Sequence, residues 1–173
     1  MKLMDIILKR RSIRKYKNDP IPEDKLDLIL QAGLLAPTSK NRKPCEFVVV
    51  RNREVLDKLS KAKTGGAEML AGCNTAVVVI ADSEKADTWI EDSSIALTYM
   101  DLMAAEQGIG SCWCQIHLRF CADGRDAESV VRGILSLPEK YRIVGILSLG
   151  IPDCATVPHT LADADFTKVK HYI

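Results

Sequence analysis

Apolar residues along the chain follow two patterns, unbroken runs and stripes at helical spacing. The runs predict four strands, at 46–50, 75–81, 111–116 and 141–150. The stripes predict amphipathic helices at 21–37, 53–62, 86–107 and 126–137, with a short helix ending near residue 10 and one or two helical turns at 67–73. Four strands interleaved with helices indicate an α/β or an α+β sandwich.

Three finer features of these elements can also be predicted. The unbroken β-branched run at 46–50 is expected to be buried on both faces of its strand. Pro22 suits the first turn of the second helix, and Pro37 ends it. The long helix at 86–107 is expected to end at a Gly108 cap, and its inward face is expected to carry four residues: Ile95, Tyr99, Leu102 and Met103.

Composition and charge disfavour several classes of protein. The chain has 173 residues, enough for one domain with a core, and a formal net charge of +1, so no global field favours nucleic acid or an anionic membrane. No apolar run reaches about 18 residues, so no transmembrane helix is expected. Apolar residues precede the N-terminal charges, the reverse of a secretory signal, and a cytoplasmic protein is expected.

The six cysteines show no C-x-x-C and no paired Cys/His spacing, so no metal site is expected. Buried, inert thiols are the favoured interpretation. A redox pair at Cys112 and Cys114 is the alternative, although a disulfide between neighbouring pleats of one strand would be strained.

Positive charge is concentrated near the N-terminus. The stretch KRRSIRKYK, residues 9–17, holds six basic residues in nine positions. The arginine fork matches phosphate oxygens, so a phosphate or an electron-rich carbonyl edge is the natural partner. A solvated surface is the alternative. Nucleic acid is disfavoured because few aromatic residues flank the run and no other basic cluster extends it.

Two loops add further polar groups that could contact a ligand. APTSKNRKP, residues 36–44, offers hydroxyls and an amide that can hydrogen-bond a polar ligand, or it is a plain helix-to-strand turn. GIGSCWCQ, residues 108–115, has glycines that let the backbone approach a ligand, although the first can be a helix cap.

The order of these motifs resembles the nitroreductase family of FMN-dependent oxidoreductases. RRSIR at 10–14 resembles its opening, and the loop and strand at 36–50 resemble its A-P-S-x-x-N-x-Q-P-W-x-F segment. EQGIGSCWCQ at 106–115 resembles its E-x-G-L-G-T-C-W segment, and VGILSLGIP at 144–152 resembles its late strand. The resemblance covers nearly the whole chain, as a short member.

The resemblance implies a fold and an assembly. The fold would be α+β, a three-layer α/β/α sandwich with a mostly antiparallel central sheet. The chain would be a single FMN-binding domain over residues 1–173 in an intertwined homodimer, with the flavin at the subunit interface. Residues 150–173 would form a tail that packs on the partner subunit.

The resemblance also implies which residues bind the cofactor. Those of the basic run would hold the phosphate and the polar edge of the ring, those of the first loop would reach the flavin of the other subunit, and those of the second loop would line the ring. The set is Arg10, Arg11, Ser12, Arg14, Pro37, Thr38, Ser39, Asn41, Ser111, Cys112, Trp113, Cys114 and His159. Lys43 and Cys45 replace the family's glutamine and tryptophan, and His159 stands where members usually place an arginine or lysine after G-x-P.

The implied activity is that of an NAD(P)H-dependent flavin oxidoreductase. Hydride would pass from NAD(P)H to flavin N5 and then to a small oxidant such as a nitroaromatic or a quinone, in ping-pong order. No side chain need act as a catalytic acid or base, and none is assigned. Two alternatives stay open: a flavin-binding or storage module without efficient turnover, and a thiol-based redox or metal-binding protein using Cys112, Cys114 and Cys121.

Overall fold

A four-stranded sheet forms the centre of the molecule. The computed structural model describes residues 2–173. The strand order is β1-β2-β4-β3, and each neighbouring pair is antiparallel. The strands are β1 (Cys45–Val50), β2 (Thr75–Asp82), β3 (Gly110–Gln115) and β4 (Tyr141–Gly150).

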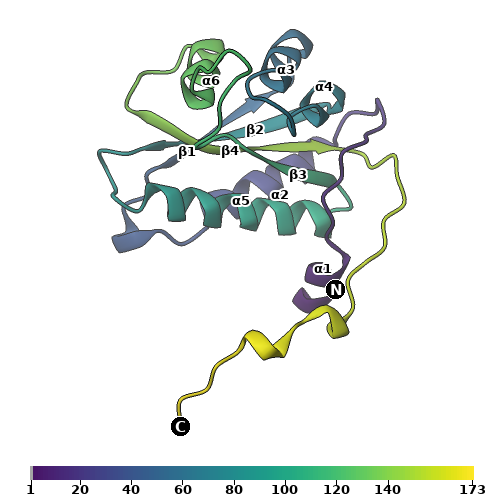
Figure 1. Cartoon of the computed structure of the whole chain (residues 1–173). Helices are drawn as coiled ribbons and strands as arrows, with labels where there is room; N and C mark the ends of the chain where they lie inside the picture. Colours follow the sequence, from purple (N-terminus) through teal and green to yellow (C-terminus); the bar gives the residue numbers. More distant parts are fainter. Residues whose placement is uncertain (1) are drawn as a thin grey trace.

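Helices cover both faces of this sheet (Figure 1). Two of them, α2 (Glu23–Leu34) and α5 (Trp89–Glu106), lie against one face. The opposite face is covered by α3 (Arg53–Ser60), α4 (Met69–Gly72) and α6 (Ala127–Leu135). The short α1 (Leu3–Lys9) contacts α5. The three-layer α/β/α sandwich with an antiparallel sheet is therefore confirmed.

The strands β1 and β2, predicted from the apolar runs at 46–50 and 75–81, differ in how far they are buried. Every residue of β2 is buried, as the run predicts, because β2 has a strand on each side and a helical layer on each face. The expectation that β1 is buried on both faces is wrong. Its middle residues are only partly covered and Val49 is 38% exposed, because β1 lies at an edge of the sheet. A β-branched run does not distinguish an edge strand from a central one.

The inward face predicted for the long helix is also wrong. The buried apolar residues of α5 are Trp89, Ala96, Leu97, Met100 and Ala104. Tyr99 is 42% exposed, and Ile95, Leu102 and Met103 are only partly buried. The helix has apolar residues on two faces, so periodicity alone cannot tell which face meets the sheet. The second face contributes to an apolar surface beside α1.

The C-terminal tail leaves the body after β4 and passes α1 (Figure 1). From residue 153 onwards every tail residue is exposed. Several large apolar side chains are among them: Val157, Leu161, Phe166, Val169 and Tyr172. Within residues 2–173, none of the helices has the length and apolar character that crossing a membrane needs.

Candidate functional site

The basic run lies along the outer edge of β3. Ser12 forms a parallel bridge with Ser111, and the Ile13 N–H donates to the Ser111 carbonyl at 2.8 Å. Main-chain groups point to alternate sides along a strand, so those of Trp113 and Gln115 face the same outer edge as the Ser111 carbonyl. The run therefore places its arginines beside a row of main-chain donors and acceptors.

Tyr16 fixes the far end of this run to the sheet. Its hydroxyl donates to the Ile13 carbonyl and lies 2.7 Å from Ser148 Oγ, which in turn donates to the Cys112 carbonyl. Burial raises the pKa of Tyr16, so the hydroxyl stays protonated and can donate. Two strands and the basic run are thus joined by one chain of hydrogen bonds.

Asp101 of α5 joins the start of the run to β3. Arg10 Nη1 lies 3.4 Å from Asp101 Oδ2, and the Ser111 hydroxyl donates to Asp101 Oδ1. Burial raises the pKa of Asp101, and the Ser111 hydrogen bond and the Arg10 charge act in the opposite direction. Asp101 was not predicted as a site residue. In the sequence it is only an acidic residue between apolar positions of a helix.

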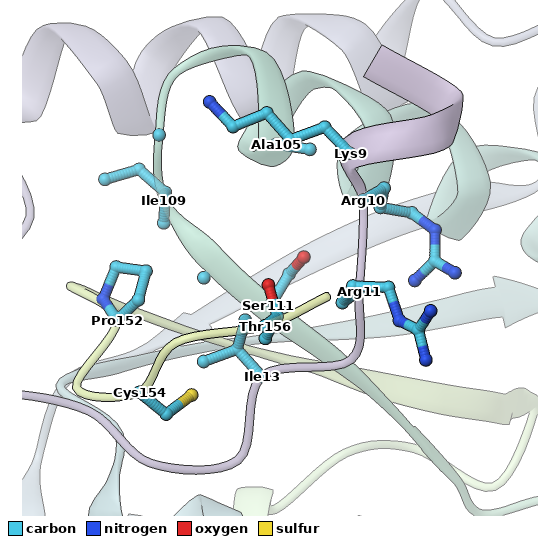
Figure 2. Close-up of a pocket in the computed structure, with 12 residues that line it drawn as sticks. Lys9, Arg10, Arg11, Ile13, Ala105, Ile109, Ser111, Pro152, Cys154 and Thr156 are labelled. Carbon is cyan, nitrogen blue, oxygen red and sulfur yellow. The ribbon is translucent and has the colours of Figure 1, made fainter. Parts of the chain in front are cut away.

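A cavity of about 300 Å³ opens between the basic run, the start of β3 and the tail (Figure 2). Its polar lining combines cations and hydroxyls and comprises Lys9, Arg10, Arg11, Ser111 and Thr156. Gly110 also lines it, and a Cβ at this position would lie 2.9 Å from Ile13 Cγ2. The glycine thus permits close approach of the chain's own run to β3.

His159 reaches the basic run from the tail. Its N–H donates to the Leu8 carbonyl at 2.8 Å, and its Nδ1 lies 3.5 Å from Arg11 Nη1. The same Nδ1 lies 3.5 Å from Asp163 Oδ2. The structure therefore places His159 beside Arg11, another residue of the predicted set.

The first loop is held at the other end of α5. The Ser39 N–H donates to Asp92 Oδ1 at 2.9 Å, and the Lys43 N–H donates to Thr38 Oγ1 at 3.1 Å. Lys40, Asn41 and Lys43 have left-handed backbones, with φ near +50°. Such a conformation is costly for non-glycine residues and often marks a functional loop. The buried Asp92 that fixes this loop was also missed from the sequence.

The predicted residues thus form two separate groups in one chain. Asp92 and Asp101, which anchor them, are nine residues apart, or about 14 Å along a helix. The loop leads into β1, whereas the basic run flanks β3, at the opposite edge of the sheet and at least about 14 Å across three strand spacings. The structure brings together the groups around Arg10 and Ser111, but not those around Ser39 and Asn41.

The side chains of β3 alternate between the two layers. Cys112 and Cys114 point into the core beneath α3 and α6, and Trp113 packs on the side of α2 and α5. Burial raises the pKa of Cys112, although Arg14 acts against it, and burial raises the pKa of Cys114 to about 11. Both thiols are therefore protonated and poor nucleophiles near neutral pH.

Comparison with known proteins decides the family. The model of the nitroreductase family matches residues 7–68 and 61–151. The chain belongs to the nitroreductase family. This confirms the resemblance seen in its motifs and identifies the chain as an oxidoreductase of that family.

Individual relatives are similar to this chain along most of its length. An "FMN-dependent Nitroreductase" of Clostridium difficile R20291 is 44% identical, with a TM-score of 0.95 over 97% of this chain and 98% of that one. A "Putative NADH dehydrogenase/NAD(P)H nitroreductase" of Archaeoglobus fulgidus is 37% identical over 86% of this chain and 84% of its own length. An "NADH dehydrogenase" of Thermus thermophilus is 30% identical, covering 84% of each chain.

Proposed function

We propose that this nitroreductase-family chain is an FMN-dependent oxidoreductase that transfers hydride from NAD(P)H to a small oxidant such as a nitroaromatic or a quinone. The observation that carries the proposal is the pairing of the basic run, with its Arg10, Arg11 and Arg14, to the outer edge of β3, next to a cavity that Arg10 and Arg11 line. The named activities of the similar proteins support it. FMN would supply the hydride chemistry, accepting from NAD(P)H and donating to the oxidant in alternate steps.

The residues present fit this cofactor. Arg11 and His159 offer donors to a phosphate at the tail side of the cavity. Arg14, whose Nη1 lies 3.5 Å from the Ser12 carbonyl, offers a cation to the polar edge of a ring placed along β3. Main-chain groups of Trp113 and Gln115 face the same edge. A fixed cation beside the ring would stabilise negative charge that develops there.

The cofactor site would be completed by a second copy of the chain. Pro37, Thr38, Ser39 and Asn41 precede the strand at the edge of the sheet opposite to the basic run, so the loop of the partner would supply them. An apolar groove of about 480 Å³ between α1, α2 and α5 offers a surface for the partner. Its lining is mainly apolar: Leu3, Ile6, Ala32, Tyr99, Leu102 and Met103.

The tail, residues 150–173, would pack on that partner. Its large apolar side chains are exposed in the single chain, Phe166 at 77%, and exposed apolar surface of this size is usually covered by another molecule. Residues 1–173 would thus form one FMN-binding domain whose last segment belongs to the dimer interface.

The visible spectrum of the purified protein, followed by NADH and then NADPH under nitrogen, tests the proposal. We expect a yellow protein that bleaches with at least one donor and recovers its colour when a quinone is added. Yellow protein that bleaches no faster than free FMN would instead support a flavin-binding module. Protein that stays colourless after incubation with FMN would contradict the proposal and favour the thiol-based alternative.

A further inference from the structure

The first loop contains three cations and no acidic residue. One of them, Arg42, lies 3.6 Å from Asp87 and donates to the Lys85 carbonyl at 3.2 Å. The other two, Lys40 and Lys43, are exposed, and in the described part of the chain neither forms an ion pair. The loop therefore presents two ammonium groups to a molecule that covers it.

The carboxylate that faces this loop from α5 is used to fix the backbone. Asp92 is buried, and its two oxygens accept from the Ser39 N–H at 2.9 Å and from the Thr88 hydroxyl at 3.2 Å. It contacts neither lysine side chain. The loop is thus held in place while its lysines stay available to a ligand.

Lys43 is held beside Thr38, a residue of the predicted flavin set. The Lys43 N–H donates to Thr38 Oγ1 at 3.1 Å, and both residues line one hollow of about 80 Å³. A hydroxyl that accepts one hydrogen bond can still donate its own proton, so Thr38 keeps a donor for a ligand. A ligand that Thr38 contacts would therefore lie close to Lys43.

The negative groups of FMN have cations of their own in the proposed site. Arg11 would serve the phosphate, and Arg14 would serve the polar edge of the ring. The loop would reach the same ring from the partner chain, on a side that the basic run does not cover. The charge of Lys43 is then left for the molecule that stacks on the ring.

We propose that Lys43 is a specificity-determining residue that favours oxidants with a negative group, such as aromatic or quinone carboxylates and sulfonates. Its ammonium would attract that group while the oxidant stacks on the flavin. Lysine suits this role because a point charge on a flexible stem can meet anions of different shape. This inference rests on the proposed function, because it names the class of oxidant for the same site.

Two nitroaromatics that differ in one charge test the inference. The FMN-loaded protein would be reduced under nitrogen and then reoxidised by para-nitrobenzoate or by neutral para-nitrobenzamide, which gives a second-order rate constant for each. The ratio of the two constants is compared between variants, so that the intrinsic reactivities of the oxidants cancel. We expect Lys43→Gln to lower the nitrobenzoate-to-nitrobenzamide ratio by about twofold to fivefold, as for one exposed ion pair.

Matched variants separate charge from structure. Lys43→Arg keeps the charge and should keep the ratio, and both substitutions meet the same left-handed backbone, with φ of +48°. Lys85→Gln removes an exposed cation just outside the loop and should leave the ratio unchanged. In the unsubstituted protein the ratio should fall as salt is added, because salt screens exposed charges.

The donor provides a second control. The extra phosphate of NADPH lies at the opposite end of the dinucleotide from the nicotinamide, so Lys43→Gln should leave the relative rates of flavin reduction by NADPH and NADH unchanged. A changed NADPH-to-NADH ratio with an unchanged oxidant ratio would overturn the inference, because the charge would then serve the donor.

Two further results would overturn the inference and leave the proposed function intact. The first is an unchanged oxidant ratio in Lys43→Gln together with unchanged donor rates, because the loop charge would then not reach the ring. The second is weaker FMN retention in Lys43→Gln than in Lys85→Gln, because the charge would then serve the cofactor. Unsubstituted protein that binds no FMN, or whose flavin neither donor reduces, would overturn the proposed function itself.

Discussion

At the scale of single residues, the cations of the N-terminal run differ in their surroundings. Arg10 is paired with Asp101, and Arg11 lies beside His159. Arg14 contacts the Ser12 carbonyl and its charge acts on the Cys112 thiol, which places it along the outer edge of β3. Arg14 is therefore the cation we assign to the polar edge of the flavin ring.

Replacement of Arg14 by alanine tests this assignment. A hydrogen bond to a charged group contributes about 1.5 to 3 kcal/mol, so we expect at least about a tenfold rise in the dissociation constant of FMN. The measurement is flavin titration of the purified variant. Lys15→Ala removes an exposed cation from the next position and should change affinity little. Equal FMN retention in the two variants would count against the assignment.

A second residue-scale prediction concerns Glu128, a buried carboxylate held by four contacts from three residues. Arg142 donates to it through Nε and Nη2, both at 2.9 Å, the Ile143 N–H donates at 3.0 Å, and His117 Nδ1 lies 2.6 Å away. Burial raises the pKa of Glu128, but the hydrogen bonds from Arg142, Ile143 and His117 outweigh it, and the net pKa is lowered. The ionised carboxylate thus stabilises the fold.

The sign of the pH effect follows from this lowered pKa. Glu128 contributes its full stabilisation above the pKa of an unfolded glutamate, about 4.3, and loses it as the pH falls through its lower pKa in the fold. Glu128→Gln should lower the free energy of unfolding at neutral pH by about 2 to 3 kcal/mol and flatten its decline in acid. Urea unfolding at a series of pH values measures both. An unchanged acid profile would show that Glu128 is not responsible.

Site residues that belong to a motif could be predicted from the sequence. Residues that only hold the motif residues in place could not. The resemblance pointed to Arg10, Ser111 and His159, and the structure places these three around one cavity or beside it. The anchoring residues Asp92 and Asp101 carried no motif, because an acidic residue in an amphipathic helix ordinarily marks the solvated face. The contact of His159 with Arg11 joins residues 148 positions apart and depends on the path of the tail.

At the scale of elements, apolar patterns predicted the existence of all four strands and their positions along the chain. They failed on which faces are covered, at β1 and at α5. Both failures have one physical reason. Apolar residues occur wherever water is excluded, and the pattern does not say whether a helix of the same chain or another surface excludes it. Three residues of the mispredicted stripe of α5, Tyr99, Leu102 and Met103, line the groove that we assign to the partner.

The two faces of α5 can be separated by experiment. Leu97 is fully buried against the sheet, so Leu97→Ala should lower the free energy of unfolding by about 2 to 5 kcal/mol. Leu102 lies in the groove, and Leu102→Ala should weaken the dimer more than it destabilises the single chain. Unfolding at several protein concentrations distinguishes the two effects. A concentration-independent loss in Leu102→Ala would mean that this face packs within the chain.

At the scale of the whole molecule, each proposed cofactor site would be shared by two chains. The basic run flanks one edge of the sheet, and the loop with Asn41 precedes the strand at the other edge. Strand order, which a single sequence does not contain, therefore separates residues that the motifs placed at one cofactor. A symmetric dimer would restore the juxtaposition, because each chain would offer its loop to the other.

The most direct test is flavin binding by mixed dimers of Arg14→Ala and Asn41→Ala chains, purified through two different tags. If the two residues reach one flavin from different chains, each mixed dimer has one doubly altered site and one unaltered site. We predict that mixed dimers bind one FMN with the affinity of the unsubstituted protein, while each parent variant binds weakly at both sites. Mixed dimers that bind as weakly as the parents at every site would show that each site belongs to a single chain.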